Sequence, residues 1–445
     1  MTVSTKQAQI AELARKNPKM VLTSLNHHLD VEWLRRAYEL TRKDGATGID
    51  GQTASDYASN LEENLQDLLN RIKSGRYRAP AVRRARIPKA DGSMRALGIP
   101  TFEDKVAQRA IVMLLEPVYE QDFLPCSYGF RPRRSAHQAV HDLRAQIMER
   151  CGRWVLDVDI RKYFDTIDPH HLRAFLARRV ADGVVRKMID KWLKAGVFDR
   201  GQLSRTRLGT PQGGVISPLL ANIYLHYALD EWFQRAVVPR MKRQVSLVRF
   251  CDDFVMVFED FLDCVRVREV LGKRLAKFGL TLHPDKTKMV DFRFKRPSGV
   301  QHHATQATTF DFLGFTHVWG KSRKGKNVVY QHTAKDRYAR ALRSVHWWCK
   351  VHRHRPITEQ HERLSRMMHG HFAYYGITGN SRRLRWYAHQ VQRIWFYWLR
   401  RRTRGSRGGY RRYQDLLTRF ALPRARVVHQ YTVPERNCHV RNRMR

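Results

Sequence analysis

The chain has 445 residues, which is long enough for two or three domains with large buried cores. Its hydrophobic fraction of 42% and aromatic fraction of 11% exclude a disordered chain. The net charge is +42, from 83 Lys and Arg against 41 Asp and Glu. Such a charge favours a polyanionic partner, of which nucleic acid is the most common.

Two further features of composition bear on location. No apolar run of about 18 residues and no signal peptide is recognised, so we expect no membrane partner. An anionic membrane surface remains the competing explanation for the charge. Six cysteines without a C-x-x-C pair favour neither a disulfide framework nor a zinc knuckle, which predicts a cytoplasmic protein.

A basic hairpin is predicted after a helical N-terminal part, residues 1–80, whose loop Gly45–Gly51 is rich in glycine. In RRARIPKADGSMRALGIPT, residues 83–101, Asp91-Gly92 joins two short basic runs and predicts the turn. A mobile cationic hairpin is suited to gripping a triphosphate or a nucleic-acid backbone, and a merely solvated hairpin is the alternative. Its cations are Arg83, Arg84, Arg86, Lys89 and Arg95.

A strand that carries aspartates follows two predicted helices, residues 103–122 and 135–150. In WVLDVDIRKYFDTID, residues 154–168, alternation places the apolar residues on one face and Asp157 and Asp159 on the other. Spacing alone does not choose between Asp157, Asp159 and Asp165 as a metal ligand.

A glycine-rich loop precedes a long predicted helix in GTPQGGVISPLLANIYL, residues 209–225. Gly209, Gly213 and Gly214 allow the backbone to approach a ligand closely, and Ser217-Pro218 begins a helix expected to continue to about residue 235. Such a loop can hold an anion, although no G-x-x-x-x-G-K-[ST] phosphate loop is present.

Two adjacent aspartates, Asp252 and Asp253, lie in SLVRFCDDFVMVF, residues 246–258. Two apolar, β-prone runs around a short polar break predict a tight hairpin with its turn residues exposed at the tip. Paired carboxylates repel each other unless a divalent cation neutralises them, and ligands that are all oxygen suit Mg²⁺. A solvated Asp-Asp turn is the alternative. We expect the strand that begins at residue 154 to bring a third carboxylate here if both strands share a sheet.

Beyond this hairpin the sequence predicts a helix at residues 262–278 and the basic stretch HPDKTKMVDF, which contains Lys286 and Lys288. An apolar strand is predicted at Thr308–Phe315, where the internal Gly314 indicates a bend or a closely packed second backbone.

The C-terminal region, from residue 321 onward, holds 31 Lys and Arg against five Asp and Glu. Its predicted helices carry aromatic residues among the arginines, and cover residues 336–352, 359–372, 382–401 and 411–421. Aromatic rings that stack on bases and cations that meet phosphates are typical of RNA-binding surfaces. The alternative is a helical bundle whose aromatic residues form its core, and we expect both, with the core more frequent.

These blocks, in this order, resemble reverse transcriptases and, within them, the proteins encoded by group II introns. The resemblance covers nearly the whole chain and is carried by GATGIDG, RIPKADGSMRALGIPT, SYGFRPRRSAHQAV, DVDIRKYFDTID, GTPQGGVISPLLANIYL, RFCDDFVMVF, LHPDKTK and FDFLGF. It implies an α+β fold, a right-hand polymerase with fingers and a palm built on antiparallel sheet, followed by a helical thumb and maturase region. The implied domains are residues 1–80 (N-terminal extension and start of the fingers), 81–320 (fingers and palm) and 321–445 (thumb and maturase).

The resemblance also implies roles for individual residues. Asp159, Asp252 and Asp253 are the expected catalytic ligands of two Mg²⁺ ions, together with Ile160 beside them. Phe164 matches the bulky gate that excludes a ribose 2′-hydroxyl. The expected contacts to nucleotide and template are Arg95, Lys89, Gln212, Gly213 and Lys286. FDFLGF, with Phe312, Leu313 and Gly314, resembles the grip on the primer strand.

The implied activity is RNA-directed DNA polymerisation with binding, splicing and mobility of a group II intron RNA. Expected partners are that structured RNA, an RNA template with a DNA primer, dNTPs and target DNA, in a ribonucleoprotein of the bacterial cytoplasm associated with the nucleoid. A homodimer is left open. Alternatives are a host-adopted reverse transcriptase for defence or repair and a splicing-only RNA chaperone.

Two departures from the family pattern are visible. Phe250 and Cys251 precede the aspartates where the family usually has Tyr-Ala, which bears on contacts to the primer end. The tail VPERNCHVRNRMR has one cysteine and none of the HNH endonuclease motif that many relatives carry, so cleavage of a target strand is not expected.

Overall fold

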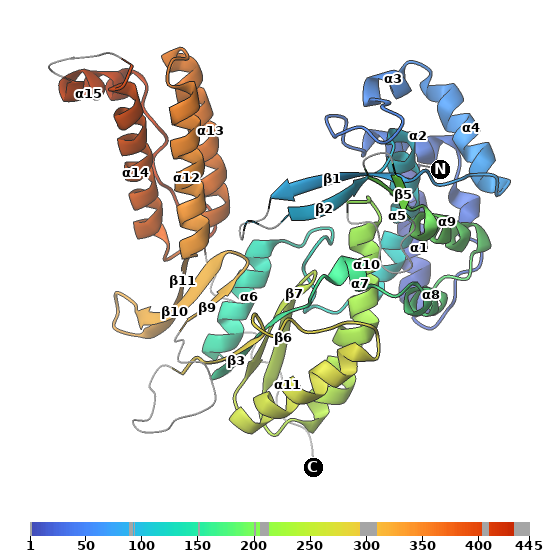
Figure 1. Ribbon diagram of the computed structural model, residues 1–445. Coiled ribbons are helices and arrows are strands. Elements are labelled where there is room, and N and C mark those ends of the chain that lie inside the picture. Colours follow the sequence, from blue (N-terminus) through green and yellow to red (C-terminus); the bar gives the residue numbers. More distant parts are fainter. Residues whose placement is uncertain are drawn as a thin grey trace. The chain divides into compact units, whose positions relative to one another are not determined.

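The computed structural model describes residues 2–88, 92, 94–149, 152–199, 202–204, 213–293, 309–402 and 409–430 (Figure 1). The chain forms two compact units. Unit 1 comprises residues 1–139 and 150–289, and unit 2 comprises residues 140–149 and 290–445. None of the helices in the described part of the chain is long and apolar enough to span a bilayer.

Several helices of unit 1 begin at a side chain that caps them. Asp30, Thr53, Thr101, Asp182 and Asp260 each accept a hydrogen bond from a backbone N–H of the first turn. The helices are α1 (Val3–Lys16), α2 (Val31–Glu39), α3 (Ala54–Ala58), α4 (Leu61–Lys73), α5 (Phe102–Asp122), α7 (Tyr163–Thr166), α8 (Pro169–Ala177), α9 (Gly183–Lys194), α10 (Ser217–Leu225) and α11 (Phe261–Ala276). The helix α6 (Ala136–Glu149) contributes to both units.

The long helix expected after the glycine-rich loop is confirmed, since residues 217–240 are helical without a break, but its hydrogen-bonding pattern changes along its length. The α-helical part, α10, ends at Leu225 and is followed by two π-helical turns, His226–Asp230 and Phe233–Val237. In a π turn each carbonyl is bonded to the N–H five positions further along the chain, which rotates the side chains that follow. This places Asp230 fully within the core of unit 1.

One sheet of unit 1 carries both aspartate segments. Its strands are β3 (Trp154–Asp159), β6 (Val245–Phe250), β7 (Asp253–Phe258) and β8 (Lys288–Asp291), in the order β6-β7-β3-β8. The pairs β6–β7 and β3–β7 are antiparallel, and α11 packs against β3 and β7 (Figure 1). The predicted strand at residues 154–160 and the predicted hairpin at residues 246–258 are therefore confirmed.

A second sheet has the order β2-β1-β4-β5, with β1 (Val82–Pro88), β2 (Met94–Ile99), β4 (Val197–Asp199) and β5 (Gln202–Ser204). The antiparallel pairing of β1 with β2 confirms the hairpin predicted from Asp91-Gly92, although Asp91 itself lies outside the described residues. Strand β1 also pairs with β4, in parallel orientation.

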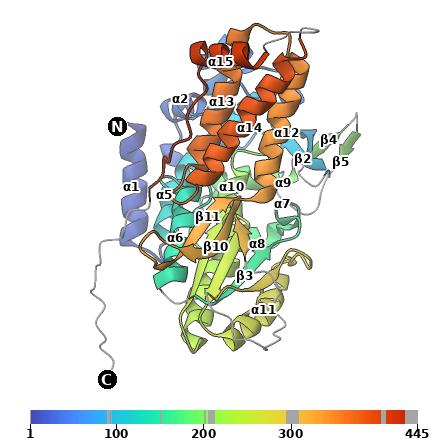
Figure 2. The same cartoon turned by 90° about the vertical axis from the view of Figure 1, so that its left-hand side faces the viewer.

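Unit 2 contains a three-stranded antiparallel sheet and a helical bundle. The sheet has the order β11-β10-β9, with β9 (Phe310–Phe312), β10 (Phe315–Lys321) and β11 (Asn327–Thr333). The helices are α12 (Lys335–His352), α13 (Ile357–Tyr375), α14 (Ser381–Leu399) and α15 (Gly409–Arg419), of which α12, α13 and α14 lie side by side in Figures 1 and 2. All four helices match the predicted ranges closely, so the α+β class with a helical C-terminal region is confirmed.

The break that Gly314 predicts in the apolar strand at residues 308–315 is confirmed, but it is a full reversal of the chain and not a bend within one strand. Leu313 and Gly314 have φ values of 50° and 79° and form the two-residue turn of a hairpin in which Phe312 pairs with Phe315. Two residues in left-handed conformations reverse the chain in a tight hairpin.

Candidate active site

The candidate active site is centred on two neighbouring strands, β3 and β7. Asp159, the last residue of β3, lies directly opposite Asp253, the first residue of β7. Asp252 precedes Asp253 in the turn, and the charge of Asp159 acts on it. The fold thus brings together three carboxylates that come from distant parts of the sequence.

The aspartates of this site have different electrostatic surroundings. Burial, and to a lesser extent the charge of Asp159, raises the pKa of Asp252, while Arg95 opposes that shift. Lys286 Nζ lies 2.9 Å from Asp159 Oδ2 in an ion pair whose side chains are 59% and 37% exposed. Arg95, on the exposed part of β2, and Lys286 are therefore the predicted cations that lie close to the aspartates.

The turn between β6 and β7 differs from the expectation that its residues would be exposed. Phe250 pairs with Asp253, so Cys251 and Asp252 form a two-residue turn, with Cys251 at φ 59°. Cys251 is only 4% exposed and Asp252 is half-buried, because a preceding loop covers the turn. A Cβ added at Gly129 in that loop would lie 2.5 Å from the Cys251 nitrogen, which only glycine permits.

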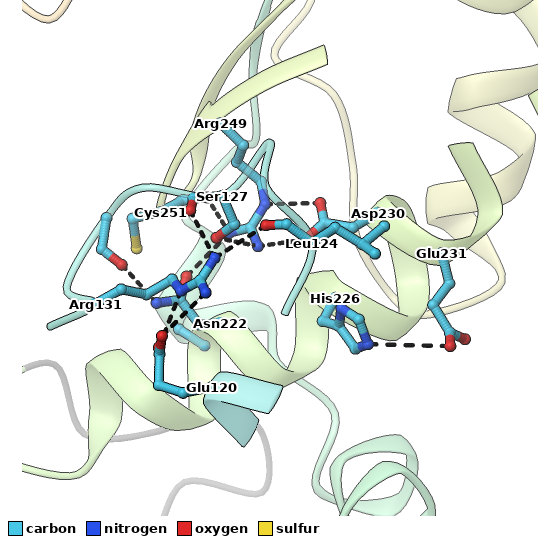
Figure 3. Close-up of polar contacts among 12 residues, drawn as sticks. Glu120, Leu124, Ser127, Arg131, Asn222, His226, Asp230, Glu231, Arg249 and Cys251 are labelled. Atoms are coloured by element: carbon cyan, nitrogen blue, oxygen red, sulfur yellow. Dashed lines mark hydrogen bonds and ion pairs between the residues drawn. The ribbon is translucent and has the colours of Figure 1, made fainter. Parts of the chain in front are cut away.

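A buried arginine lies beneath this turn. Arg249 is fully buried on β6 and forms a two-bond ion pair with Asp230, with Nε–Oδ1 at 2.8 Å and Nη2–Oδ2 at 2.5 Å. It also donates to Ser127 Oγ, to Asn222 Oδ1 and to the carbonyl of Cys251 in the turn (Figure 3). The sequence analysis did not predict a role for Arg249. Its charge within the otherwise apolar run SLVRF could have indicated one.

The residues next to Asp159 occupy distinct environments. Ile160 is buried and forms an isolated antiparallel bridge with Leu282. The hydrogen bonds of this bridge are made by the flanking residues. They run from Arg161 N to Thr281 O and from His283 N to Asp159 O. In such a bridge the carbonyl of Ile160 is directed away from Leu282. Of the two other aspartates considered as ligands, Asp157 lies opposite Val255 inside the sheet and Asp165 is exposed on α7.

Phe164 is half-buried on α7 and packs beside Tyr163, with ring centroids 5.4 Å apart. Tyr163 is fully buried and donates to the carbonyl of Ala221, on α10, at 2.6 Å. The short helix that carries Phe164 is thus anchored to the helix that follows the glycine-rich loop. A half-buried ring on an anchored helix has a fixed position from which to contact a ligand.

The glycine-rich loop is described from Gly213 onward. Gly213 has φ 117°, and an added Cβ would lie 2.7 Å from the carbonyl oxygen of Gly98 on β2. This close approach explains why glycine is needed there. Lys89 and Gln212, which are also among the expected nucleotide contacts, lie outside the described residues.

Several cations of the basic hairpin have partners within unit 1. Arg83 donates to the carbonyl of Thr47, and Arg86 forms an ion pair with Asp199 at 2.5 Å. Arg84 lies 3.6 Å from the same carboxylate. These three arginines stabilise the hairpin, which the sequence had presented only as a cationic surface.

The predicted primer grip lies in unit 2. Phe312 is buried, and Leu313 accepts a hydrogen bond from Tyr374 Oη at 2.9 Å through its carbonyl oxygen. A Cβ added at Gly314 would lie 3.2 Å from Tyr375 Oη. The hairpin turn is thus held against α13 within unit 2.

The oxygen atoms at the strand ends suit a divalent cation. Within the described ranges, no group of three or more His, Cys, Asp and Glu side chains is arranged to hold a metal ion. Two opposed strand ends nevertheless supply carboxylate oxygens, and the ammonium of Lys286 already pairs with one of them. Hard oxygen ligands of this kind fit Mg²⁺ better than any soft metal.

The chain is similar to several known proteins. Residues 87–317 match the family model described as reverse transcriptase (RNA-dependent DNA polymerase). Protein YkfC of Escherichia coli (strain K12) is 31% identical over 390 residues, which cover 79% of this chain and 98% of that protein.

Two other relatives have names that refer to introns. The group II intron-encoded protein LtrA of Lactococcus lactis subsp. cremoris is 37% identical over 223 residues, or 49% of this chain and 36% of LtrA. Nuclear intron maturase 1, mitochondrial, of Arabidopsis thaliana is 30% identical over 95 residues, or 21% of this chain and 13% of that protein. The matched segments thus span only a minor part of these two relatives.

Proposed function

Because this chain belongs to the reverse transcriptase (RNA-dependent DNA polymerase) family, and within it is related to group II intron-encoded reverse transcriptases and maturases, we propose that Asp159, Asp252 and Asp253 form its catalytic centre. The enzyme is an RNA-directed DNA polymerase. The observation that supports this centre is the opposition of Asp159 and Asp253 at the ends of two paired strands, with Asp252 in the adjoining turn.

These three carboxylates and the backbone carbonyl of Ile160 would hold the Mg²⁺ ions. When bound, the metal ions supply activation of the primer 3′-hydroxyl and stabilisation of the leaving pyrophosphate. The protein itself holds primer, template and nucleotide in line, since positioning accounts for much of the rate in such transfers. Lys286, which pairs with Asp159 in the structure, is proposed to meet the nucleotide phosphates.

The remaining contacts are proposed on the same basis. Arg95 and Lys89 meet the triphosphate, and Gln212 with Gly213 lines the nucleotide and template site. Phe164 excludes ribonucleotides by contact with the 2′-hydroxyl. The primer strand is held by Phe312, Leu313 and Gly314.

The basic helical region is proposed to bind the intron RNA and so to assist splicing and mobility. Support comes from unit 2 itself, where one hollow is lined by His332, Trp386 and the arginines Arg382, Arg383 and Arg385. An exposed ring between cations can stack on a base while the cations meet the phosphates. The same proposal divides the chain at residues 80 and 320 into fingers, palm and thumb. It also places the protein in a cytoplasmic ribonucleoprotein that contacts target DNA.

The experiment is primer extension on an RNA template by the full chain carrying Asp252→Asn, with Asp165→Asn as its control. The first change removes a charge from the proposed centre with little change in volume, and the second removes an exposed aspartate. We expect the first variant to lose extension and keep RNA binding, and the control to retain both. Full extension by Asp252→Asn would refute the assignment.

A further inference from the structure

The guanidinium of Arg249 is saturated by partners from four separate segments. An arginine has five N–H donors, and here the Nε donor and the four Nη donors meet Asp230, Asn222, Ser127 and the Cys251 carbonyl. The backbone is tied as well, since Arg249 N donates to Cys126 O and Tyr128 N donates to Arg249 O, both at 2.8 Å. The Arg249 side chain thus joins the turn at Cys251 and Asp252 to the loop of Ser127, to helix α10 at Asn222 and to the π turn of Asp230.

Stability alone does not account for such a pair. Replacing a buried ion pair by apolar residues of similar volume is often neutral or stabilising, because removing two charges from water is costly. Arg249 and Asp230 are both fully buried. What this pair adds is a fixed position for the carbonyl group that it holds. Apolar side chains cannot impose such a position.

The geometry that it fixes is that of the aspartate turn. Cys251 adopts a left-handed backbone at φ 59°, which is unfavourable for a residue with a side chain and persists only where its surroundings impose it. Arg249 Nη1 holds the Cys251 carbonyl at 2.9 Å. From the other side Gly129 presses against the Cys251 nitrogen, and its carbonyl accepts a hydrogen bond from Asn222 Nδ2 at 2.6 Å.

We infer that Arg249, supported by Asp230 and Asn222, is a positioning residue that sets where Asp252 and Asp253 present their carboxylates to a divalent cation. The inference rests on the proposed function of these aspartates. Arg249 is fully buried, and all its guanidinium donors are occupied by protein groups. It acts through the peptide group of Cys251, whose carbonyl immediately precedes Asp252.

The test compares lysine substitutions at two buried arginines of unit 1. Arg249→Lys keeps the positive charge that faces Asp230. A lysine has only three N–H donors, so it cannot make all five hydrogen bonds that Arg249 makes. The matched control, Arg179→Lys, affects another buried arginine, which pairs with Asp122 at 2.8 Å and holds carbonyls near residues 14–20. Mn²⁺ binding by the nucleic-acid-free protein is followed by electron paramagnetic resonance, and primer extension is measured against Mg²⁺ concentration.

We expect Arg249→Lys to weaken Mn²⁺ binding by about tenfold or more and to raise the Mg²⁺ concentration for half-maximal extension similarly, as for other residues that orient metal ligands. Arg179→Lys should change neither. If Arg249→Lys fails to fold, Arg249→Met combined with Asp230→Leu removes the buried charge with its partner and should show the same metal defect.

The inference is overturned if the folded Arg249 variant matches the Arg179 control in both metal measurements. Asp252→Asn, assayed in parallel, distinguishes failure of the positioning role from failure of the proposed centre. If Asp252→Asn loses extension while Arg249→Lys binds metal normally, the positioning role fails and the proposed centre stands. If Asp252→Asn extends primers normally, the proposed centre fails.

Discussion

Asp159 and Asp253 are direct partners across β3 and β7, so the end of one strand places its carboxylate opposite the start of the other. Like charges opposite each other in an antiparallel pair are destabilising, and a nearby cation compensates for this. In the structure that cation is the ammonium of Lys286, 2.9 Å from Asp159. The same arrangement explains why a divalent cation would be favoured at this position.

Lys286→Met should lower the Mg²⁺ concentration needed for half-maximal extension. The ammonium of Lys286 and a metal ion compete for Asp159, and the variant removes one competitor. If Lys286 also contacts the nucleotide phosphates, the KM for dNTP should rise in the same variant. Steady-state extension over a grid of Mg²⁺ and dNTP concentrations separates the two effects. Lys288→Met, at an exposed position two residues away, is the control, and equal curves for both variants would contradict the prediction.

Phe164→Val should admit ribonucleotides. Removing part of a half-buried ring opens space beside the sugar, and steric exclusion of this kind is worth about 1–3 kcal/mol, or roughly tenfold to 200-fold in selectivity. The measurement is the ratio of kcat/KM for dNTP and rNTP on one template. Unchanged sugar discrimination, with normal dNTP incorporation, would remove Phe164 from the gate role.

Asp104 should make unfolding depend on pH. It is buried on α5 and accepts hydrogen bonds from Tyr77, Trp192 and Gln108, while burial raises its pKa from 3.8 to about 6. Between these values the folded protein binds the proton more tightly than the unfolded chain. This contribution to the free energy of unfolding is therefore fully present below about pH 4 and decreases as pH rises to about 6, by at most about 1.4 kcal/mol per pH unit.

Asp104→Asn should flatten that part of the pH profile. Urea unfolding between pH 4 and pH 7 measures it, and an unchanged slope would contradict the role of Asp104. Asp122, whose pKa burial also raises to about 6, retains its own contribution in the variant, so the slope should decrease and not vanish.

Two tryptophans of α14 should respond differently to truncation. Trp386 is 53% exposed, whereas Trp395 is fully buried and donates to Gln360 Oε1 at 3.0 Å. Trp386→Ala should weaken binding of single-stranded RNA by about 1–3 kcal/mol with little change in melting temperature. Trp395→Ala should instead lower the free energy of unfolding by about 3–5 kcal/mol. Equal RNA affinity for Trp386→Ala and the unaltered protein would exclude stacking on this ring.

Much of the local structure could be predicted from the sequence. The aspartate hairpin, strand β3 and the four C-terminal helices follow from periodicities and turn residues that lie within short windows of the chain. The charge of +42 and the order of the motifs likewise need no coordinates to point to nucleic acid and to the reverse transcriptases. These properties are local or additive, and a linear reading therefore captures them.

Tertiary structure alone decided which distant groups meet. The strand register places Asp159 opposite Asp253, and a slip of one residue would have turned Asp159 to the other face of the sheet. Burial of the Cys251 turn, the saturation of Arg249 and the pairing of Arg86 with Asp199 depend on contacts between segments far apart in the chain. Side-chain periodicity states which face a residue occupies, but the partner on that face is fixed only when the strands and helices pack.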